Sequence, residues 1–472
     1  MRKYIPLLIV WLVLILTPLV AAQPGVFAVM PISSDPYTNP DAQHQTQASL
    51  DNFAYGNTVV AVFETGLYLT GDFTGGSTNI GWATSTDGGN TYSIGFLPGA
   101  TPYSTPPGPW AFVDNPVVTY DARHDVWLIL AFASPPIVEI LSRSTDGGIT
   151  WSAPIAISSG GAWDPAIGCD NSPSSPYYGH CYSMNTYSYM EPVHVRTSTD
   201  GGQTWGPEVV GPTPARTADD PQIVVQPNGT AIAVMKHADF AGPFPFMSIA
   251  SRDGGQSWGS RVWRLFTPQT NPVNLLHTGL LSAATDEEGR VFVASADCRF
   301  RQYCRSLTND IVLTTSTDGR NWSKLMRIPI GPARSSATYF IPGLAVTGSG
   351  SAARLGLTYY YYPDAACDLS TCQLYAGFIS SADGGLTWGA PQTLAGPMDL
   401  SWLPPYEDRR VLTSYISSAF VGDTAVSVLG LAQPPIGDTF QLAAWAARVP
   451  TSTLQNSYLS LRGDLVHANT SR

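Results

Sequence analysis

The chain has 472 residues, of which only 12% are charged, and a formal net charge of −11. A negative charge of this size argues against nucleic acid or an anionic membrane surface as a partner. The length suffices for three average domains, but the internal repeats described below favour one large repetitive unit.

The first residues read as an export signal. Met1-Arg2-Lys3 is followed by an almost wholly apolar run from Ile5 to Val20 and by small residues up to Ala22. We therefore predict that residues 1–22 are a signal peptide cleaved near Ala22, and that the protein is secreted or held at the cell surface. An uncleaved membrane anchor stays open as the alternative, although the run is a little short for a spanning helix of ~20 residues.

One short pattern recurs along the rest of the chain, most clearly from Ser144 to Trp151. Its Asp-Gly-Gly core favours a tight turn, because glycine adopts positive φ at little cost and an aspartate accepts hydrogen bonds from its own turn. The aromatic residue that ends the pattern can anchor the turn from below. We expect a structural role for the six aspartates of the pattern, which are Asp87, Asp146, Asp200, Asp253, Asp318 and Asp383.

Four strand-like runs surround each copy of the pattern. In the second repeat they cover residues 116–120, 126–133, 138–142 and 153–157. Short strands with glycine-rich turns predict an all-β fold, a β-propeller of four-stranded antiparallel blades. Three more runs follow the last copy, and residues 25–32 supply their fourth strand, so we favour seven blades, with six as the alternative. The propeller then spans residues 23–450, and residues 451–472 form a polar tail.

The six cysteines form three close pairs along the sequence. Behind an export signal, such pairs predict short-loop disulfides. The pairs are Cys169 with Cys181, Cys298 with Cys304, and Cys367 with Cys372.

The pattern Ser-x-Asp-x-Gly-x-Thr-Trp resembles the Asp-box, or bacterial neuraminidase repeat, of the sialidase superfamily. The resemblance implies a propeller with structural Asp-boxes and an exo-glycosidase, in particular an exo-α-sialidase, that acts on extracellular glycans. It also implies three arginines for the substrate carboxylate, a Tyr–Glu pair and an Asp acid/base. Asp72, fifteen residues before Asp87, matches the expected acid. The first arginine is missing, because no Arg or Lys lies between Tyr4 and Ala122.

Propeller geometry predicts where the remaining candidates meet. Loops that enter each innermost strand share one face with the loops that join the second and third strands. Arginines there would hold a carboxylate or sulfate, and carboxylates would serve acid/base chemistry or bind Ca²⁺; loop bracing and turn formation are the alternatives. The candidate substrate-binding residues are Arg216, Arg334, Arg410, Asp114, Asp164 and Asp220, the acids standing in related positions just before a proline-led strand. The candidate catalytic residues are Asp72, Glu191 and Tyr339, with the tyrosine as a nucleophile activated by a neighbouring base.

Two functions stay open at this point. The first is a secreted, sialidase-like propeller that binds or hydrolyses extracellular glycans. The second is a non-catalytic propeller that binds or assembles proteins at the cell surface, which the missing arginine favours. We expect a monomer that requires no cofactor, with Ca²⁺ as the one candidate ion.

Overall fold

The computed structural model describes most of the chain between residues 27 and 460. The described residues are 27–69, 75–160, 163–186, 192–212, 218–237, 245–259, 263–266, 275–276, 280–301, 304, 306, 308–406, 408–451 and 459–460. The predicted signal peptide lies outside this part. No helix among the described residues has the length and apolar character needed to cross a membrane.

The protein is an all-β structure, as predicted, and its strands form seven groups of four. In chain order the groups are β2 (Gln43–Tyr55), β3 (Thr58–Leu67), β4 (Ser77–Ser85) and β5 (Ser93–Phe96); β6 (Phe112–Asp121), β7 (Val126–Ser134), β8 (Val138–Ser144) and β9 (Ile155–Ala156); β10 (Trp163–Cys169), β11 (Cys181–Thr186), β12 (Val193–Ser198) and β13 (Val209–Val210); β14 (Ala218–Val225), β15 (Ala231–His237), β16 (Pro245–Ser251) and β17 (Trp263–Phe266); β18 (Leu281–Thr285), β19 (Val291–Asp297), β20 (Asp310–Ser316) and β21 (Met326–Arg327); β22 (Thr338–Thr347), β23 (Arg354–Tyr362), β24 (Gln373–Ser381) and β26 (Gln392–Asp399); and β29 (Ser417–Val421), β30 (Thr424–Ile436), β31 (Thr439–Pro450) and β1 (Ala28–Pro31). Neighbouring strands within each group pair antiparallel.

Smaller elements complete the structure. Helical structure in the described part consists of short 3-10 turns such as η2 (Gly350–Ala352) and η3 (Leu400–Trp402). The two-residue strands β27 (Pro405–Tyr406) and β28 (Arg409–Arg410) pair with each other. β32 (Leu459–Ser460), from the end of the chain, pairs with β25 (Thr387–Trp388). At least this part of the predicted polar tail therefore lies against the sixth group of strands.

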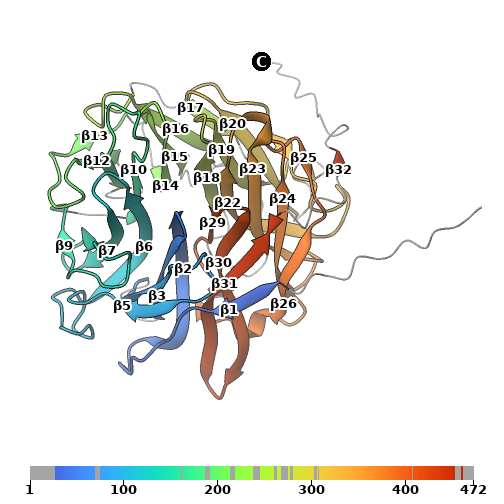
Figure 1. The fold of residues 1–472 in the computed structure, drawn as a ribbon. Coiled ribbons are helices and arrows are strands. Elements are labelled where there is room, and N and C mark those ends of the chain that lie inside the picture. Colours follow the sequence, from blue (N-terminus) through green and yellow to red (C-terminus); the bar gives the residue numbers. More distant parts are fainter. Residues whose placement is uncertain are drawn as a thin grey trace, which may run out of the picture.

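The groups stand around a common centre, with the first strand of each group nearest to it (Figure 1). The two ends of the chain meet in the last group, where β1 pairs antiparallel with β31. β31 also touches β2 through the parallel pair Thr46 and Leu442, which connects the last group to the first. Strands from the beginning of the described chain, β1 and β2, therefore both pair with β31 near its end.

Side chains connect neighbouring first strands where no ladder joins them. Asp51 Oδ2 on β2 accepts a hydrogen bond from Val118 N on β6 at 2.9 Å. Gln222 Oε1 on β14 accepts one from Ala283 N on β18 at 2.7 Å, and Leu344 N on β22 donates to Ser282 Oγ at 2.9 Å. These bonds satisfy N–H groups on the inner strand edges, which would otherwise lack partners.

The hydrophobic core lies between the groups rather than in a single central layer. Leu128 and Leu141 of the second group pack with the disulfide between Cys169 and Cys181 of the third. Similar clusters join the first group to the second and the sixth to the last. Each group buries apolar side chains against both neighbours, so the sheets stabilise one another through their faces.

The six predicted turns have the expected stapled geometry. In the second copy, Ser144 Oγ donates to Asp146 Oδ1 at 2.8 Å and accepts from Gly148 N at 2.9 Å. Thr150 donates to Asp146 through its N at 2.9 Å and its Oγ1 at 2.6 Å. Trp151 Nε1 donates to Gly148 O at 3.1 Å. Asp87, Asp200, Asp253, Asp318 and Asp383 make closely related bonds in their own turns.

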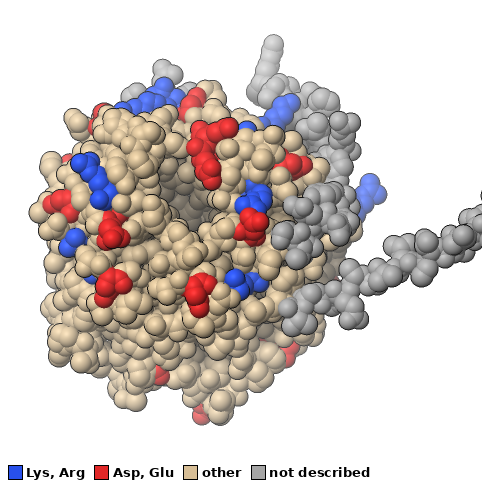
Figure 2. Space-filling view, viewed as in Figure 1, with Lys and Arg blue, Asp and Glu red and all other residues tan. Residues whose placement is uncertain are grey.

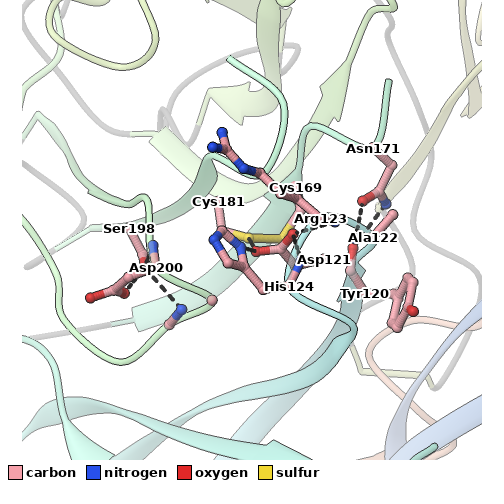
Figure 3. Close-up of a disulfide and its surroundings, with 12 residues drawn as sticks. Tyr120, Asp121, Ala122, Arg123, His124, Cys169, Asn171, Cys181, Ser198 and Asp200 are labelled. Carbon is pink, nitrogen blue, oxygen red and sulfur yellow. Dashed lines mark hydrogen bonds and ion pairs between the residues drawn. A yellow bond between two sulfur atoms is a disulfide. The ribbon is translucent and has the colours of Figure 1, made fainter. Parts of the chain in front are cut away.

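The three predicted disulfides are confirmed, and no described cysteine is free. Figure 3 shows the first of them, between Cys169 and Cys181, beside the turn that follows β6. Asn171 spans this junction: its Oδ1 accepts from Ala122 N and its Nδ2 donates to Tyr120 O, each at 2.8 Å. The disulfide joins β10 to β11 within the third group and packs against the second group, and the Asn171 amide supplies the hydrogen bonds between the two groups.

Candidate functional site

A cavity of about 520 Å³ occupies the centre of the molecule. Residues of all seven first strands line it, from Asp51 on β2 to Phe420 on β29. A space-filling view shows the hollow at the middle of the molecule (Figure 2). The wall combines aliphatic side chains, such as Ile223, Leu281 and Val346, with many polar ones. The described lining residues include carboxylates but no Lys, Arg or His.

Five of the first strands carry a β-bulge near their beginning. In β2, β6, β10, β14 and β22 the pairing register with the second strand shifts by one residue. The residues at four bulges have positive φ: Ser49 (50°), Asn115 (48°), Asp164 (49°) and Ile341 (48°). Non-glycine residues seldom adopt this conformation, and bulges of this kind often re-aim side chains next to active sites.

The bulges correct one expectation from the sequence. Asp114 and Asp164 each stand close before a proline, which suggested equivalent positions. The register instead pairs Asp114 with Phe132 and Trp163 with Thr186, so Asp164 corresponds to Asn115. Asp114 is therefore the last paired residue before the bulge of β6, whereas Asp164 lies within the bulge of β10.

Two carboxyl groups meet at the bulge of β6. The backbone N–H of Asn115 lies 2.8 Å from Glu64 Oε1 and 2.9 Å from Asp114 Oδ1. Glu64 comes from the middle of β3 and is 4% exposed, whereas Asp114 is half-buried. The two side chains also share a hydrogen bond with each other. Two carboxyl groups this close disfavour each other's ionisation.

The Asn115 side chain extends the cluster toward the cavity. Its Nδ2 donates to Asp164 Oδ1 at 3.2 Å, and its Oδ1 accepts from Ser49 Oγ at 3.3 Å. Tyr415, also a lining residue, donates its hydroxyl to Pro116 O at 2.9 Å. Asn115 therefore organises the cluster through both its backbone and its amide.

The surroundings shift the acidity of these groups. Burial, followed by the neighbouring Glu64 carboxyl and then by Asp164, raises the pKa of Asp114 well above its ordinary value. Burial raises the pKa of Asp51 to about 6, although the hydrogen bond from Val118 opposes the shift. Burial also raises the pKa of Tyr415, and the carboxylates of Glu64, Asp51, Asp114 and Asp164 add to it. Asp114 is thus a carboxyl group that gives up its proton less readily than an ordinary aspartate.

A glycine stands beside Asp114 and contributes no side chain there. This residue is Gly75, and a Cβ atom at Gly75 would stand 3.5 Å from Asp114 Oδ2. Gly75 itself has a φ of +126°, which side-chain-bearing residues rarely adopt. A group that approaches the proton of Asp114 therefore meets no side chain from this position.

Of the predicted catalytic residues, the structure describes only Tyr339. Its ring packs against Tyr359 and Tyr361 and beneath the guanidinium of Arg301. Burial raises the pKa of Tyr339, which is the opposite of what a nucleophilic phenolate needs. The structure thus places Tyr339 among packed aromatic rings and outside the residues that line the central cavity. Asp72 and Glu191 lie outside the described residues.

The predicted arginine cluster does not form among the described residues. Arg334 is exposed on the loop before β22, and Arg410 on β28 donates from Nη1 to Leu403 O at 3.1 Å. Neither of them lines the central cavity. Arg216 and the side chain of Asp220 are not described. No group of three or more His, Cys, Asp or Glu residues in the described part is placed to hold a metal ion.

The sequence analysis missed Glu64, Asn115 and Tyr415. The sequence did contain a signal for Glu64, since this acid directly follows the apolar run from Val59 to Phe63. Charged residues are almost never fully buried without a partner. Nothing in the sequence connects Glu64 with Asn115, because the bulge register decides that contact.

A family model described as a BNR repeat-like domain matches residues 110–365, more than half of the chain. A search of curated proteins finds no match. Among solved structures the fold is similar to an ulvan lyase of polysaccharide lyase family PL25, with a TM-score of 0.51 and 10% identity over 88% of this chain and 94% of that one. A Hadza microbial sialidase has a TM-score of 0.45 and 13% identity over 87% and 67% of the two chains. A protein of unknown function from Dyadobacter fermentans has a TM-score of 0.45 and 15% identity over 75% and 99%.

Proposed function

The chain belongs to the BNR repeat-like family of the sialidase type, and on this premise we propose that it is an exported, seven-bladed β-propeller that hydrolyses extracellular glycans. One observation carries the proposal. The carboxyl oxygens of Glu64 and Asp114 converge on the single N–H of Asn115, at 2.8 and 2.9 Å, near the central cavity. A carboxyl group whose pKa is raised by burial and by a neighbouring carboxyl group is suited to act as a general acid.

The propeller part of the proposal rests on the strand arrangement. Seven first strands line one cavity, and β1 completes the last group from the other end of the chain. Each group then corresponds to one blade. Closure by both ends of the chain removes open sheet edges, which is how propellers avoid edge-to-edge association.

The chemical part assigns a role to each carboxyl group. Asp114 donates its proton to the glycosidic oxygen as the bond to the sugar carbon breaks. Asp164 accepts a proton from the water that adds to that carbon, so the two carboxyl groups flank the scissile bond. Glu64 is a positioning residue, because it is buried and acts by raising the pKa of Asp114.

Turnover of a panel of aryl glycosides and natural oligosaccharides tests the assignment. We expect Asp114→Asn to lose about 10²–10⁴-fold in kcat, the usual contribution of a general acid. Glu64→Gln should keep measurable activity but move the basic limb of the pH profile to lower pH, because Asp114 loses the neighbour that raises its pKa. Asp438→Asn, at the exposed tip of the β30–β31 hairpin, is the charge-matched control. Full activity in Asp114→Asn would refute the proposal.

Export is the second part to test. Three disulfides suit an oxidising compartment, and the predicted signal covers residues 1–22. N-terminal sequencing of the protein recovered from the culture medium should begin after Ala22. Recovery of full-length protein from the membrane fraction would favour the uncleaved anchor instead.

A non-catalytic interaction propeller is the second candidate function. The placement of Arg334 and Arg410 away from the cavity favours it, because a sialidase-type carboxylate clamp needs its arginines together. Glycan binding without turnover, unchanged in Asp114→Asn, would support this candidate over the hydrolase.

A further inference from the structure

The side chains at three neighbouring bulges form a chain of hydrogen bonds from one strand group to the next. The register shifts leave Ser49, Asn115 and Asp164 as the first unpaired residue of the bulges in β2, β6 and β10. Their φ angles are nearly the same, at 50°, 48° and 49°, so these three residues occupy equivalent positions. Ser49 Oγ donates to Asn115 Oδ1 at 3.3 Å, and Asn115 Nδ2 donates to Asp164 Oδ1 at 3.2 Å. The bulge of β14 has Asp220 at this position, and the side chain of Asp220 lies outside the described residues.

The two ends of this chain fix the orientation of the amide between them. An ionised carboxylate only accepts hydrogen bonds, so Asp164 selects the orientation that turns Nδ2 of Asn115 toward it. The reverse orientation would set two acceptors against each other. At the other end, Ser49 is 2% exposed, and its backbone N donates to Thr413 Oγ1 at 3.1 Å. The hydroxyl that binds the amide is therefore itself held in a buried position.

A general base needs a defined orientation, because it acts only on a proton within hydrogen-bond reach. The Asn115 amide restricts the rotation of Asp164, and a hydrogen bond to a carboxylate also stabilises its charged form. We propose that Ser49 and Asn115 are positioning residues for Asp164, acting in series to orient its carboxylate toward the water that it activates. This inference rests on the proposed function, because it assigns the residues that support the base of the same site.

The test must leave the other titratable groups around Asp164 in place. Among the described residues these groups are Asp114, Glu64, Asp51 and Tyr415. Asn115→Gly meets this need, because glycine adopts a φ of 48° without strain. The variant then keeps the bulge and the backbone N–H that binds Glu64 and Asp114, and it loses only the amide.

The pH profile of hydrolysis separates a positioning role from a merely structural one. On the aryl glycoside that the wild type turns over, we expect Asn115→Gly to lower kcat about tenfold, as for one hydrogen bond to a charged group, with KM within about threefold. The acidic limb of the profile reports the base, and it should move up by about 1 pH unit because the ionised form of Asp164 loses a donor. The basic limb should stay in place, since Asp114 keeps its neighbours. Ser49→Ala should move the acidic limb in the same direction but less far, because Ser49 acts through the amide.

Two further variants complete the experiment. Asn57→Gly, at the exposed turn between β2 and β3, is the matched control and should move neither limb. Asn115→Asp is the second variant at the bulge, in case the glycine loosens it. Aspartate has the same shape and also visits positive φ, but its ionised side chain cannot donate to Asp164, so the acidic limb should rise again.

The outcomes distinguish the two proposals. An unmoved acidic limb in both Asn115 variants, or a raised KM at unchanged kcat, overturns the positioning role. The proposed function then stands if Asp114→Asn still abolishes turnover. If the wild type turns over no glycan, both proposals fall.

Discussion

Glu139 offers a test of how the sheets pack against each other. It lies on β8, is fully buried, and faces Asn185 and Ser183 on β11 and the guanidinium of Arg196. Burial raises the pKa of Glu139 from 4.5 to about 7, a shift that the Asn185 side chain and Arg196 only partly oppose. The folded protein therefore binds this proton more tightly than the unfolded chain does. The contribution of Glu139 to the stability of the folded protein must fall as the pH rises from 4.5 to about 7.

The size of the effect follows from the shift. A change from 4.5 to about 7, at about 1.4 kcal/mol for each pH unit, corresponds to about 3 kcal/mol. Below pH 4.5 Glu139 is protonated in both states and costs nothing. Above pH 7 the full penalty applies. Glu139→Gln keeps the shape of the protonated acid but never ionises, so we expect it to stabilise the protein by about 3 kcal/mol at pH 8 and by little at pH 4.5.

Urea unfolding of the wild type and Glu139→Gln across this pH range measures the difference directly. Groups that are identical in the two proteins contribute equally to both and largely cancel. Glu288→Gln, at an exposed position, is the matched control and should change stability by less than about 0.5 kcal/mol at every pH. A pH-independent difference between the wild type and Glu139→Gln would refute the reasoning.

Three further predictions concern the turns and the disulfides. Gly147 and Gly148 have φ of +80° and +83°, but a Cβ meets nothing within 4 Å at Gly147 and lies 2.8 Å from Val60 Cγ2 at Gly148. Gly147→Ala should therefore cost about 1 kcal/mol and Gly148→Ala about 2–4 kcal/mol; equal costs in urea unfolding would contradict this. The Thr150 hydroxyl lowers the pKa of Asp146 to about 2, so the turn's ionic contribution is present above pH 3.8 and is lost as the pH falls toward 2. Asp146→Ala should lower stability by about 1 kcal/mol at pH 7 and flatten this acid limb in melting curves. Replacing Cys169 and Cys181, which are 12 residues apart, by serine should cost about 3 kcal/mol, and reductant should then have less effect on the melting temperature than in the wild type.

The repeating turns could be predicted because they are local. Within eight residues, Ser144 to Trp151 supply the acceptor, the flexible glycines, the donors and the aromatic anchor. The disulfides are local for the same reason, since each closes a loop of 5 to 12 residues. The order of strands followed from these turns together with the apolar runs between them.

The candidate site could be predicted only in part. Asp114 and Asp164 were identified from their place before the first strands, but their partners were not. Glu64 and Asn115 are 51 residues apart, and their contact depends on a bulge that gives Asn115 a positive φ. The arginines and Tyr339 were chosen for chemistry that the sialidase resemblance implies. In the structure Arg410 donates a hydrogen bond to Leu403 O, and Tyr339 packs against other tyrosine rings.

Sequence alone determined the all-β class, the stapled turns and the cysteine pairing, because each follows from interactions among residues that are neighbours in the chain. Only the tertiary structure decided which carboxyl groups meet at the bulge of β6 and which residues line the central cavity. Both depend on how separate sheets pack around the central cavity, where burial strengthens charge interactions and a single-residue shift in register changes which side chains meet.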